Sequence, residues 1–365
     1  MRIGLLTESL CADRGWGRYA TELVDRLGRK GFELVVVETQ NLPMRQLRWH
    51  KREPFLTLDH GLRVLQQTVS IRSRVRDCDV IHAMTERLAP AAAIIAGRRR
   101  FVFNAYGTFA TRPLGRLLRR PFAAAIYRRA SRIACISRYT ETRIQGMLPE
   151  ARTTIVPSGV DFMRFQSSEP VENCDPLTIL IVGAVKPRKG HHVLLEALAA
   201  VRESVPGVRL RVAGNPDFPD YFRSLQQRVQ DLRLEDAVTF LGRVDETQLI
   251  KEYHRCAVFV LPSMNVGDAY EGYPLVFAEA GACGRPVIGT HGNGSEEAVS
   301  DGVNGLLVPQ GDVAATADAV SRLLTDHELS SRLGAQGRER ARLLTWDRTA
   351  DAFATIYREL APARV

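Results

Sequence analysis

The chain has 365 residues, of which 45% are hydrophobic and 25% charged, with 18 Pro and 28 Gly. These fractions are ordinary for a folded globular protein and exclude a disordered, collagen-like or coiled-coil chain, while the length predicts two domains. The formal net charge of +9 is uneven: residues 1–165 carry 29 Lys+Arg and 14 Asp+Glu, whereas residues 166–365 carry 21 and 27. Only the first half is therefore expected to meet an anionic partner.

Cysteine spacing and hydropathy bear on where the protein works. The cysteines form no CxxC pair and no zinc-like cluster with histidine, which is typical of thiols in a reducing cytosol. They are Cys11, Cys78, Cys135, Cys174, Cys256 and Cys283. Residues 1–8 lack the apolar core of a signal peptide, and no apolar run approaches the ~20 residues that span a bilayer. We expect a cytoplasmic protein that at most lies on the inner surface of the membrane.

Short apolar strands alternate with amphipathic helices in the first half, a rhythm typical of βαβ units and a parallel sheet. The expected elements are a strand at 3–7, a helix at 17–29 and strands at 34–37, 79–83, 101–105 and 132–136. Residues 166–176 are polar, contain two prolines and are expected to form an interdomain linker.

The same rhythm restarts after the linker. Strands are expected at 177–182, 209–213, 238–240, 258–261 and 286–289, and helices at 191–204, 247–256, 312–325 and 346–360. We predict an α/β protein with two tandem Rossmann-like, doubly wound domains, at 1–165 and 177–345, followed by a C-terminal segment at 346–365.

The first candidate site is a glycine-rich turn. Gly15-Trp16-Gly17-Arg18-Tyr19-Ala20 has the GxGxxA spacing of a dinucleotide fingerprint, and Glu38 ends the second expected strand. In that fingerprint the tight turn directly follows its strand, whereas Gly15 stands well beyond the expected strand end at Thr7. A longer glycine loop that approaches a phosphate or sugar, and a plain loop before a helix, are the alternatives.

The second candidate follows the first strand of the second half. In Gly183-Ala184-Val185-Lys186-Pro187-Arg188-Lys189-Gly190, three cations and two glycines stand where a strand turns into a helix. The amides of a helix N-terminus favour an anion, and Lys and Arg add charge-assisted hydrogen bonds to phosphate. The segment is either a phosphate site or a solvated basic turn.

The third candidate has two carboxylates. Glu271-Gly272-Tyr273-Pro274-Leu275-Val276-Phe277-Ala278-Glu279 places one carboxylate before a helix and one inside it, after the strand at 258–261. Ligands of open α/β sheets bind at the carboxyl ends of strands. The amides from Gly272 to Val276 could receive a phosphate, and Glu279 could accept two hydrogen bonds from a ribose diol. The alternative for Glu279 is a solvent-facing helix residue.

Metal and nucleophile motifs are weak. Asp77-Cys78-Asp79 is a DxD triplet, but it stands at the entry of an expected strand and is interpreted as a polar strand start. No other metal-ligand spacing and no GxSxG nucleophile motif occurs in the sequence. We therefore assign no metal ligand.

The basic excess is concentrated in one segment. Residues 98–143 contain twelve arginines and one acidic residue, Glu141. On a single helix Arg112, Arg116 and Arg119 would share one face, with Arg120 beside it, as in a surface for anionic lipid. A solvated arginine-rich face is the alternative. Nucleic acid is a weaker candidate, since aromatic residues do not interleave with the arginines in the way that stacking sites require.

Several ordered segments share one family pattern: Glu271 and Glu279 with their Glu-x7-Glu spacing, then 155–161, 240–244, 279–288 and 292–308. With them the chain resembles the retaining nucleotide-sugar glycosyltransferases of the two-domain GT-B type. The resemblance covers nearly the whole chain and is strongest over 155–310. Its specificity is high because several motifs agree in order.

The resemblance implies that the second domain holds the donor, with Lys189 and Glu271 as catalytic residues. Lys189 would meet the diphosphate, together with Gly183, Lys186 and Arg188. Glu279 would hold the ribose. In this family, cations and amides rather than a metal or other cofactor stabilise the departing nucleotide diphosphate.

The remaining donor contacts come from three segments. Glu271 and the residues after it (Gly272, Tyr273, Pro274, Leu275 and Val276) would contact the donor sugar and the distal phosphate. The segment Gly242-Arg243-Val244 would lie beside the base. The loop of Gly15 and Gly17 would close over the phosphates, which decides its interpretation against a dinucleotide.

On the acceptor side the resemblance implicates the first domain. Its expected acceptor-side residues are His82, Tyr106, Gly107 and Ser137, and the final helix is expected to cross back onto this domain. Three residues depart from the family pattern: Ala184 replaces an arginine, Tyr106 a histidine and Pro274 a glycine. The first departure leaves the phosphate role to Lys186 or Arg188.

The resulting hypothesis is a metal-independent enzyme that moves a hexose-type sugar from a nucleotide diphosphate to an acceptor hydroxyl with retention. The acceptor would be a carbohydrate or a lipid-linked precursor of a cell-surface glycan, with an anionic membrane surface, but no nucleic acid, as a further partner. The alternatives are an NAD(P)-dependent oxidoreductase built on Gly15–Ala20 and a sugar-nucleotide-binding module without catalysis.

Overall fold

The computed structural model describes residues 1–10, 15–39, 68–166 and 174–361. Contacts divide the chain into unit 1, Met1–Ser158 with Trp346–Val365, and unit 2, Gly159–Thr345. The division precedes the expected boundary at 165 because the short helix α7 (Phe162–Phe165) belongs to unit 2. Its Phe165 is buried in the core of that unit, and the Phe165 carbonyl accepts a hydrogen bond from His254.

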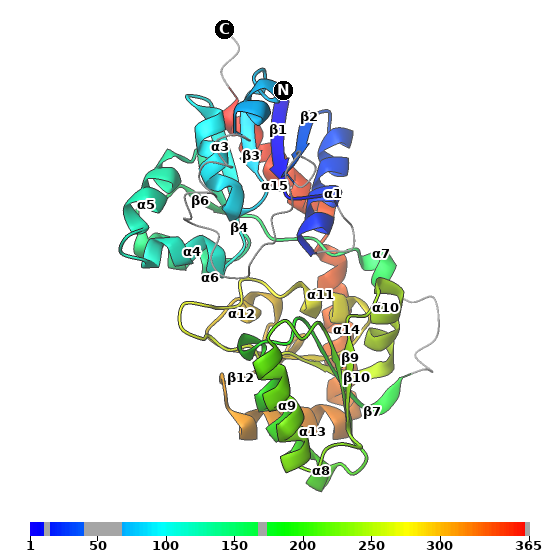
Figure 1. The fold of residues 1–365 in the computed structure, drawn as a ribbon. Helices are drawn as coiled ribbons and strands as arrows, with labels where there is room; N and C mark the ends of the chain where they lie inside the picture. Colours follow the sequence, from blue (N-terminus) through cyan, green and yellow to red (C-terminus); the bar gives the residue numbers. More distant parts are fainter. Residues whose placement is uncertain (11–14, 40–67, 167–173, 362–365) are drawn as a thin grey trace. The chain divides into compact units, whose positions relative to one another are not determined.

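The described part of unit 1 contains a six-stranded parallel sheet with the order β2-β1-β3-β4-β5-β6 (Figure 1). Strands buried on both faces appear in a sequence as continuous apolar runs, which is why most of them could be predicted. They are β1 (Arg2–Thr7), β2 (Glu33–Glu38), β3 (Val80–Ala83), β4 (Arg100–Ala105), β5 (Arg132–Cys135) and β6 (Thr153–Ile155).

Helices connect these strands and cover the sheet. Small apolar residues let a helix lie close to the sheet. Helix α3, for example, buries alanines against β3 and β4. The helices include α1 (Gly15–Arg29), α3 (Ala89–Ala96), α4 (Thr108–Gly115), α5 (Arg120–Arg129), α6 (Arg138–Met147) and α15 (Trp346–Leu360), with a 3₁₀ turn at Glu86–Leu88.

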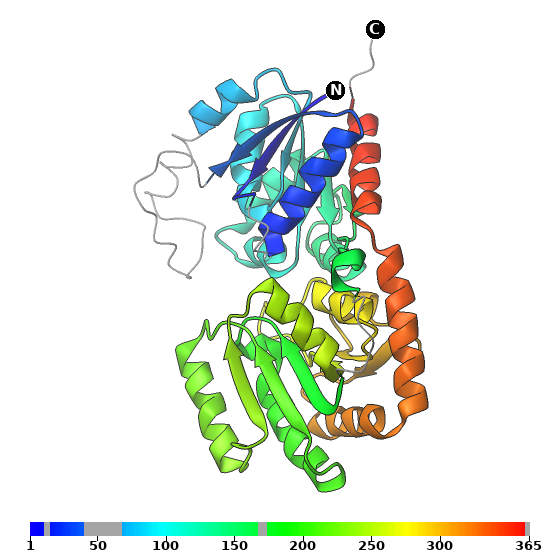
Figure 2. The same ribbon diagram turned by 90° about the vertical axis from the view of Figure 1, so that its right-hand side faces the viewer.

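The final helix α15 completes unit 1 rather than unit 2, and Figure 2 shows it beside α1. The rings of Tyr19 and Trp346 meet edge to face with 5.3 Å between their centroids. Lys30 Nζ lies 2.6 Å from Asp351 Oδ1. Aromatic contact and charge pairing thus fix α15 along α1.

A second six-stranded parallel sheet, ordered β12-β11-β10-β7-β8-β9 within the described residues, forms the centre of unit 2. The prediction of two doubly wound α/β domains is confirmed by these two sheets. The strands are β7 (Asp175–Val182), β8 (Arg209–Ala213), β9 (Val238–Gly242), β10 (Cys256–Val260), β11 (Val287–Thr290) and β12 (Gly305–Val308).

The helices of unit 2 pack on this sheet, and the predicted helix at 191–204 has the same bounds in the structure. They are α8 (His191–Ser204), α9 (Pro219–Asp231), α10 (Glu246–Arg255), α11 (Leu275–Ala282), α12 (Ser295–Ala298), α13 (Val313–Thr325) and α14 (His327–Leu343), with a 3₁₀ turn at Pro187–Lys189. No helix in the described ranges is long and apolar enough to cross a bilayer.

The strand order reverses once in each sheet. From β7 the chain continues to β8 and β9 on one side, whereas β10 lies on the other side of β7. In unit 1, β2 and β3 likewise flank β1 on opposite sides. Loops that leave the carboxyl ends of such neighbouring strands diverge, and the crevice between them is where open α/β sheets bind ligands. Ligand sites are therefore expected in the loops that follow β7 and β10, and in those that follow β1 and β3.

The arginine-rich segment does not form the single helix face predicted from Arg112, Arg116 and Arg119. Arg112 lies in α4, which ends at Gly115, whereas Arg116 and Arg119 lie in the turn before α5, which begins at Arg120. The Arg116 carbonyl accepts hydrogen bonds from the N–H groups of Arg119 and Arg120, at 2.9 and 2.8 Å, and so starts a new turn. Pro121 in the first turn of α5 explains the restart, since proline is favoured at a helix start.

Candidate functional site

The loop after β7 forms a tight basic turn. Gly183 has a φ of +141° and Gly190 a φ of +71°, values that side-chain-bearing residues rarely adopt. A Cβ on Gly190 would also come within 1.9 Å of the Pro262 carbonyl oxygen, in the loop after β10. The turn delivers the chain to the start of α8, whose first turn has no side-chain cap and so presents backbone amides and a partial positive charge.

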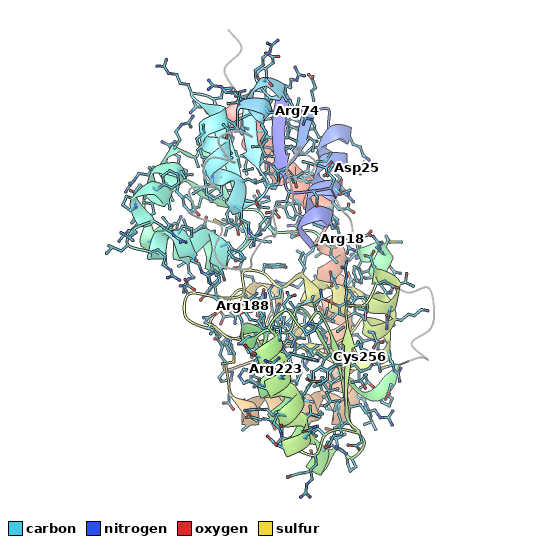
Figure 3. All side chains as sticks on the ribbon, viewed as in Figure 1. Arg18, Asp25, Arg74, Arg188, Arg223 and Cys256 are labelled. Carbon is cyan, nitrogen blue, oxygen red and sulfur yellow. The ribbon has the colours of Figure 1, made fainter. Side chains whose placement is uncertain are left out.

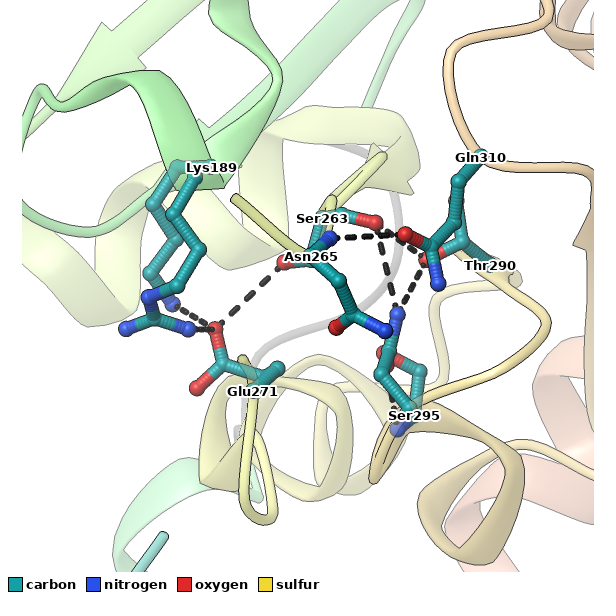
Figure 4. A network of polar contacts seen from close by, with 9 residues as sticks. Lys189, Ser263, Asn265, Glu271, Thr290, Ser295 and Gln310 are labelled. Atoms are coloured by element: carbon teal, nitrogen blue, oxygen red, sulfur yellow. Dashed lines mark hydrogen bonds and ion pairs between the residues drawn. The ribbon is translucent and has the colours of Figure 1, made fainter. Parts of the chain in front are cut away.

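Glu271 stands at the centre of a buried cluster of charges (Figure 4). Its Oε2 lies 2.7 Å from Lys189 Nζ and 2.5 Å from Arg188 Nη1. The hydroxyl of Ser263 donates a weaker hydrogen bond to the same oxygen, at 3.4 Å. Among the described residues no hydrogen bond ends on Oε1, so a hydroxyl group of a ligand could donate to this oxygen.

The cluster changes the acidity of its members. Burial opposes the charge of Glu271, but Lys189 and Arg188 outweigh it and lower the pKa of the carboxyl to about 2. Burial also lowers the pKa of Lys189, against the attraction of Glu271. Burial, together with repulsion from Arg188 and Lys189, lowers the pKa of Lys186 to about 8. The site thus holds one carboxylate among three cationic groups, with a net positive charge at neutral pH.

Lys186 and Arg188, the two candidates for the phosphate role that Ala184 leaves open, have different surroundings in the structure. The turn brings Arg188 onto Glu271, beside Lys189, and Figure 3 labels it on the ribbon. Of the two candidates left open by the sequence, Arg188 is the one in contact with the carboxylate. Lys186 is near enough for these charges to act on its pKa.

A polar network behind Glu271 fixes the loops after β10 and β11. The Ser263 carbonyl accepts hydrogen bonds from Thr290 Oγ1 at 2.6 Å and from Asn293 Nδ2 at 3.3 Å. Asn293 Nδ2 also donates to Thr290 Oγ1, and Asn293 Oδ1 accepts from the Ser295 amide. These residues had no individual sequence signal, because their roles arise only when β10 and β11 lie side by side.

The backbone of the Glu271 loop is pinned by a close approach. The Gly294 amide donates to the Glu271 carbonyl at 2.9 Å, and a Cβ on Gly294 would lie 1.8 Å from the Gly272 carbonyl oxygen. Glu271 is therefore positioned by packing that tolerates only glycine at 294.

The second carboxylate, Glu279, lies in the middle of α11. It is half-buried, and the buried Tyr253 hydroxyl donates to its Oε2 at 2.8 Å. Glu279 is therefore not a fully exposed helix residue. Helix α11 packs closely on α14, where a Cβ on Gly281 would meet the Gly337 carbonyl oxygen at 2.9 Å. This contact holds Glu279 near the carboxyl end of the sheet.

The remaining donor-side residues lie after β9 and before α11. Gly242 ends β9 with a φ of +65° and accepts a hydrogen bond from the Gly214 amide; Arg243 is exposed and Val244 half-buried. Gly272 and Tyr273 lead to Pro274, the N-cap of α11, whose side chain accepts no hydrogen bond from the amides of the first turn. The amides at Leu275 and Val276 thus begin a helix without a side-chain cap.

Unit 1 has its own pocket at the carboxyl ends of β1, β3 and β4, and Tyr106 is the one lining residue that the sequence singled out. Glu86 is 5% exposed, accepts a hydrogen bond from the Tyr106 amide at 3.3 Å, and has its pKa raised by burial to about 7. The buried Thr85 hydroxyl has no hydrogen-bond partner among the described residues. The pocket is lined by Glu8, Thr85, Glu86, Arg87, Tyr106 and Phe109.

Arg87 closes one side of this pocket. Its guanidinium lies 4.5 Å from the centroid of the Phe109 ring, and its Nη1 is 3.7 Å from Glu8 Oε1. Tyr106, an expected acceptor-side residue, lines the pocket, while Gly107 follows it as the N-cap of α4 with a φ of +138°. No sequence pattern marks Glu86 as a functional residue, because a single glutamate after a strand is common in exposed loops.

Two expected acceptor-side residues have structural roles instead. His82 is fully buried: its Nδ1 is 2.6 Å from the Tyr357 hydroxyl and its Nε2 is 2.8 Å from Asn104 Oδ1. Asn104 Nδ2 extends this series of hydrogen bonds by donating to the Tyr106 hydroxyl at 2.8 Å. Ser137 is also buried and caps α6 by accepting a hydrogen bond from the Thr140 amide. These contacts contradict their assignment to the acceptor.

The glycine turn of unit 1 is described only in part. Gly15 and Gly17 lie in the first turn of α1, and residues 11–14 before them are outside the described ranges. Glu38, which the dinucleotide interpretation required for a ribose, accepts a hydrogen bond from the Leu10 amide at 2.8 Å. Asp79 of the DxD triplet accepts one from the Arg2 amide. Both carboxylates thus bind the backbone near β1.

We expect Glu271→Gln to lower the stability of unit 2 by about 3 kcal/mol at neutral pH, because it leaves buried cations without an anion. The pKa of Glu271 lies below its ordinary value, so its contribution is complete above about pH 4.5 and is lost as the pH falls toward about 2. Hydrogen exchange of the β7 and β10 amides measures the difference. The control is Glu339→Gln, which removes an exposed ion pair with Arg342 and should cost at most about 1 kcal/mol. Equal effects of the two variants would contradict the role given to Glu271.

Comparison with known proteins agrees with this geometry. The family model for glycosyl transferases group 1 matches residues 163–340, and the model for glycosyltransferase family 4 matches residues 14–164. A solved structure of Anabaena HepE in complex with UDP and glucose has a TM-score of 0.76 to this chain at 21% identity, covering 98% of this chain and 99% of that one. The fold is thus that of the two-domain GT-B glycosyltransferases.

Curated relatives match a shorter stretch. A D-inositol 3-phosphate glycosyltransferase of Saccharomonospora viridis is 35% identical over 234 residues, which cover 60% of this chain and 53% of the relative. A GDP-mannose-dependent alpha-(1-6)-phosphatidylinositol monomannoside mannosyltransferase of Mycobacterium tuberculosis is 32% identical over 235 residues, 60% of each chain. The matches thus span little more than half the length of these relatives. With adjoining family models along nearly its whole length, the chain belongs to the group 1 glycosyltransferases of the GT-B type.

Proposed function

We propose that this protein transfers a hexose-type sugar from a nucleotide diphosphate to an acceptor hydroxyl, with retention at the anomeric carbon. The observation that carries the proposal is the buried cluster of Glu271, Lys189 and Arg188 at the point where the strand order of unit 2 reverses. The named activities of the relatives, which use inositol phosphate or phosphatidylinositol mannoside, and the UDP held by the structural neighbour support a nucleotide-sugar reaction.

The cations of the cluster suit a diphosphate. A bound diphosphate would bring two or more negative charges to Lys186, Arg188 and Lys189, and the uncapped start of α8 would add backbone amides. Glu271 then keeps Oε1 for a hydroxyl of the donor sugar. Half-buried Glu279 is proposed to accept hydrogen bonds from the ribose diol. Because these groups supply the positive charge, we propose that the reaction requires no metal.

The acidity of Glu271 restricts its role. A carboxyl with a pKa of about 2 is a weak base at neutral pH, so we assign it to holding the sugar and not to deprotonating the acceptor. In the proposed reaction the bond between the anomeric carbon and the diphosphate oxygen breaks, and the acceptor oxygen bonds to the same face. The acceptor proton passes to the departing diphosphate.

We propose that the pocket of unit 1, which has a volume of about 10 Å³ and so has room for one small polar group, binds a hydroxyl of the acceptor. Glu86 has a pKa of about 7, so at neutral pH it exists in both protonation states and can accept from, or donate to, a hydroxyl group. The unpartnered Thr85 hydroxyl offers a second contact of the same kind. This chemistry fits a polyol or sugar. Buried free thiols, Cys78, Cys135 and Cys256 among them, support a reducing, cytoplasmic setting.

The alternative functions make different predictions. An oxidoreductase would use Glu38 for the ribose of NAD(P), but Glu38 is engaged by the Leu10 amide. A binding module would take up a nucleotide sugar and never release the nucleotide diphosphate. Release of nucleotide diphosphate that requires an acceptor separates transfer from both alternatives.

The decisive experiment measures binding and turnover together. Thermal shifts with UDP-, GDP- and ADP-sugars identify the donor, because a ligand that binds the native state raises its stability. A panel of sugars, polyols and inositol phosphates then identifies the acceptor by release of nucleotide diphosphate. Glu279→Ala should weaken binding of the nucleoside diphosphate by about hundredfold and abolish transfer, while inorganic diphosphate, which has no ribose, binds as before. Tyr253→Phe, which leaves the carboxylate in place, is the control. Full activity of Glu279→Ala would refute the donor site.

We expect binding of diphosphate to depend on pH because of Lys186. Its pKa of about 8 in the free protein means that it loses its proton as the pH rises from about 7 to about 9, and binding of diphosphate falls by up to about tenfold. Lys186→Arg keeps the charge throughout this range and should remove the decline. Calorimetric titration with inorganic diphosphate at each pH measures it. A decline that persists in Lys186→Arg would show that another group is responsible.

We expect a change at Glu86 to weaken binding of the acceptor and leave binding of the donor unchanged. Glu86→Gln resembles the protonated carboxyl in shape and should leave the fold intact, yet raise the KM for the identified acceptor by about tenfold or more. The dissociation constant of the donor should stay within about twofold of the wild-type value. Glu150→Gln, an exposed change in the same unit, serves as the control. Equal changes for donor and acceptor would contradict an acceptor role for this pocket.

A further inference from the structure

The turn between α4 and α5 exposes large apolar side chains. Leu117 is 88% and Leu118 92% exposed, more than any other large hydrophobic residue in the described part of the chain. Isolated exposed hydrophobic residues are common, but two adjacent leucines at one tip are an apolar patch that favours burial against a partner.

The exposure is built into an ordered turn. Leu117 and Leu118 are its two central residues, and the Arg119 amide closes it with a hydrogen bond of 2.9 Å to the Arg116 carbonyl. Because the hydrogen bonds from the Arg120 and Ala123 amides continue this turn into α5, Leu118 and Phe122 lie one helical turn apart. Phe122 is 58% exposed. Leu117, Leu118 and Phe122 are thus exposed apolar residues of the turn and the first turns of α5, and we call them the Leu117 tip.

Basic residues surround the tip. Residues 108–129, which comprise α4, the turn and α5, contain six arginines and no acidic residue. Arg116 and Arg119 flank the leucines, and Arg120 begins α5. Arg112 packs near the Phe109 ring of α4, with 5.7 Å from its guanidinium carbon to the ring centroid. Arginine side chains carry charge at every physiological pH, so the region stays positive.

These two properties together select one occupant. A phosphate backbone would pair with the arginines but leave the leucines in water, and an apolar protein groove would bury the leucines but gain nothing from the arginines. An anionic lipid bilayer offers headgroup charge at its surface and hydrocarbon just below it. We propose that the Leu117 tip inserts into the interface of an anionic membrane, with Arg116, Arg119 and Arg120 at the headgroups.

This proposal corrects the surface expected from the sequence. The arginines alone were expected to form it, on one helix face. The structure instead gives the central place to the two leucines and divides the arginines among α4, the turn and α5. The inference does not depend on the glycosyl transfer proposed above, because it concerns attachment of unit 1 to a surface and is tested without a donor or an acceptor.

The test uses the full chain with unilamellar vesicles of phosphatidylcholine alone, or with about a third of phosphatidylglycerol, in a sedimentation assay. We expect binding to the anionic vesicles. Leu117→Gln with Leu118→Gln keeps every charge and should reduce the partition coefficient by about tenfold or more. Arg116→Gln with Arg120→Gln should reduce it by about fivefold for each arginine, and more strongly at low salt. Far-UV circular dichroism should show that both variants are folded.

The matched control is Met163→Gln with Val303→Gln, which replaces two exposed apolar residues of unit 2 and should bind vesicles like the wild type. Wild-type protein that stays in solution with both kinds of vesicle would overturn the proposal. So would leucine variants that bind like the wild type. Loss of a dimer in the leucine variants, detected by sedimentation velocity without vesicle binding by the wild type, would assign the tip to a second copy and also overturn it.

Discussion

The interaction on which the candidate site depends is the attraction of Glu271 for two buried cations. Lys189 and Arg188 come from the loop after β7, and Glu271 from the loop after β10, so the ion pairs join the two loops on either side of the strand reversal. A buried charge without a partner is strongly unfavourable. The cations proposed to bind a diphosphate are therefore held in place by a carboxylate of the protein itself. In the free protein the carboxylate of Glu271 thus supplies negative charge at the place where a diphosphate is proposed to add further negative charge.

Close backbone contacts make this arrangement possible. The loop of Lys189 meets the Pro262 carbonyl at Gly190, and the loop of Glu271 meets the chain at Gly294; each contact excludes a Cβ. The contact of Gly281 with the Gly337 carbonyl plays the same part for α11, which carries Glu279. Three separate loops or helices are thus fixed by backbone packing, and the charged side chains only need to extend from positions that are already set. This limits the reorganisation required when a charged ligand enters.

Much of this architecture could be predicted from the sequence, because buried parallel strands are continuous apolar runs and helices repeat with a different period. Lys189, Glu271 and Glu279 were singled out from the sequence as donor-site candidates, and the structure brings Lys189 and Glu271 into contact. His82 and Ser137 were assigned to the acceptor, whereas their side chains bind Tyr357 and Thr140. A sequence position after or within a strand does not tell whether a polar side chain faces a ligand or the core. Glu86 was missed for the converse reason: only the fold buries it.

The place of α15 has a consequence for synthesis of the chain. This helix supplies Tyr357, the partner of His82, and Trp346, the partner of Tyr19, but it follows the whole of unit 2 in the sequence. Unit 1 therefore cannot complete its core when residues 1–158 have emerged. At typical translation rates of roughly 5–20 residues per second, the whole of unit 2 is made during a delay on the order of ten to forty seconds. For that time the faces of α1 and β3 that α15 covers in the folded protein lack this helix, so unit 1 completes its core only after unit 2 has been synthesised.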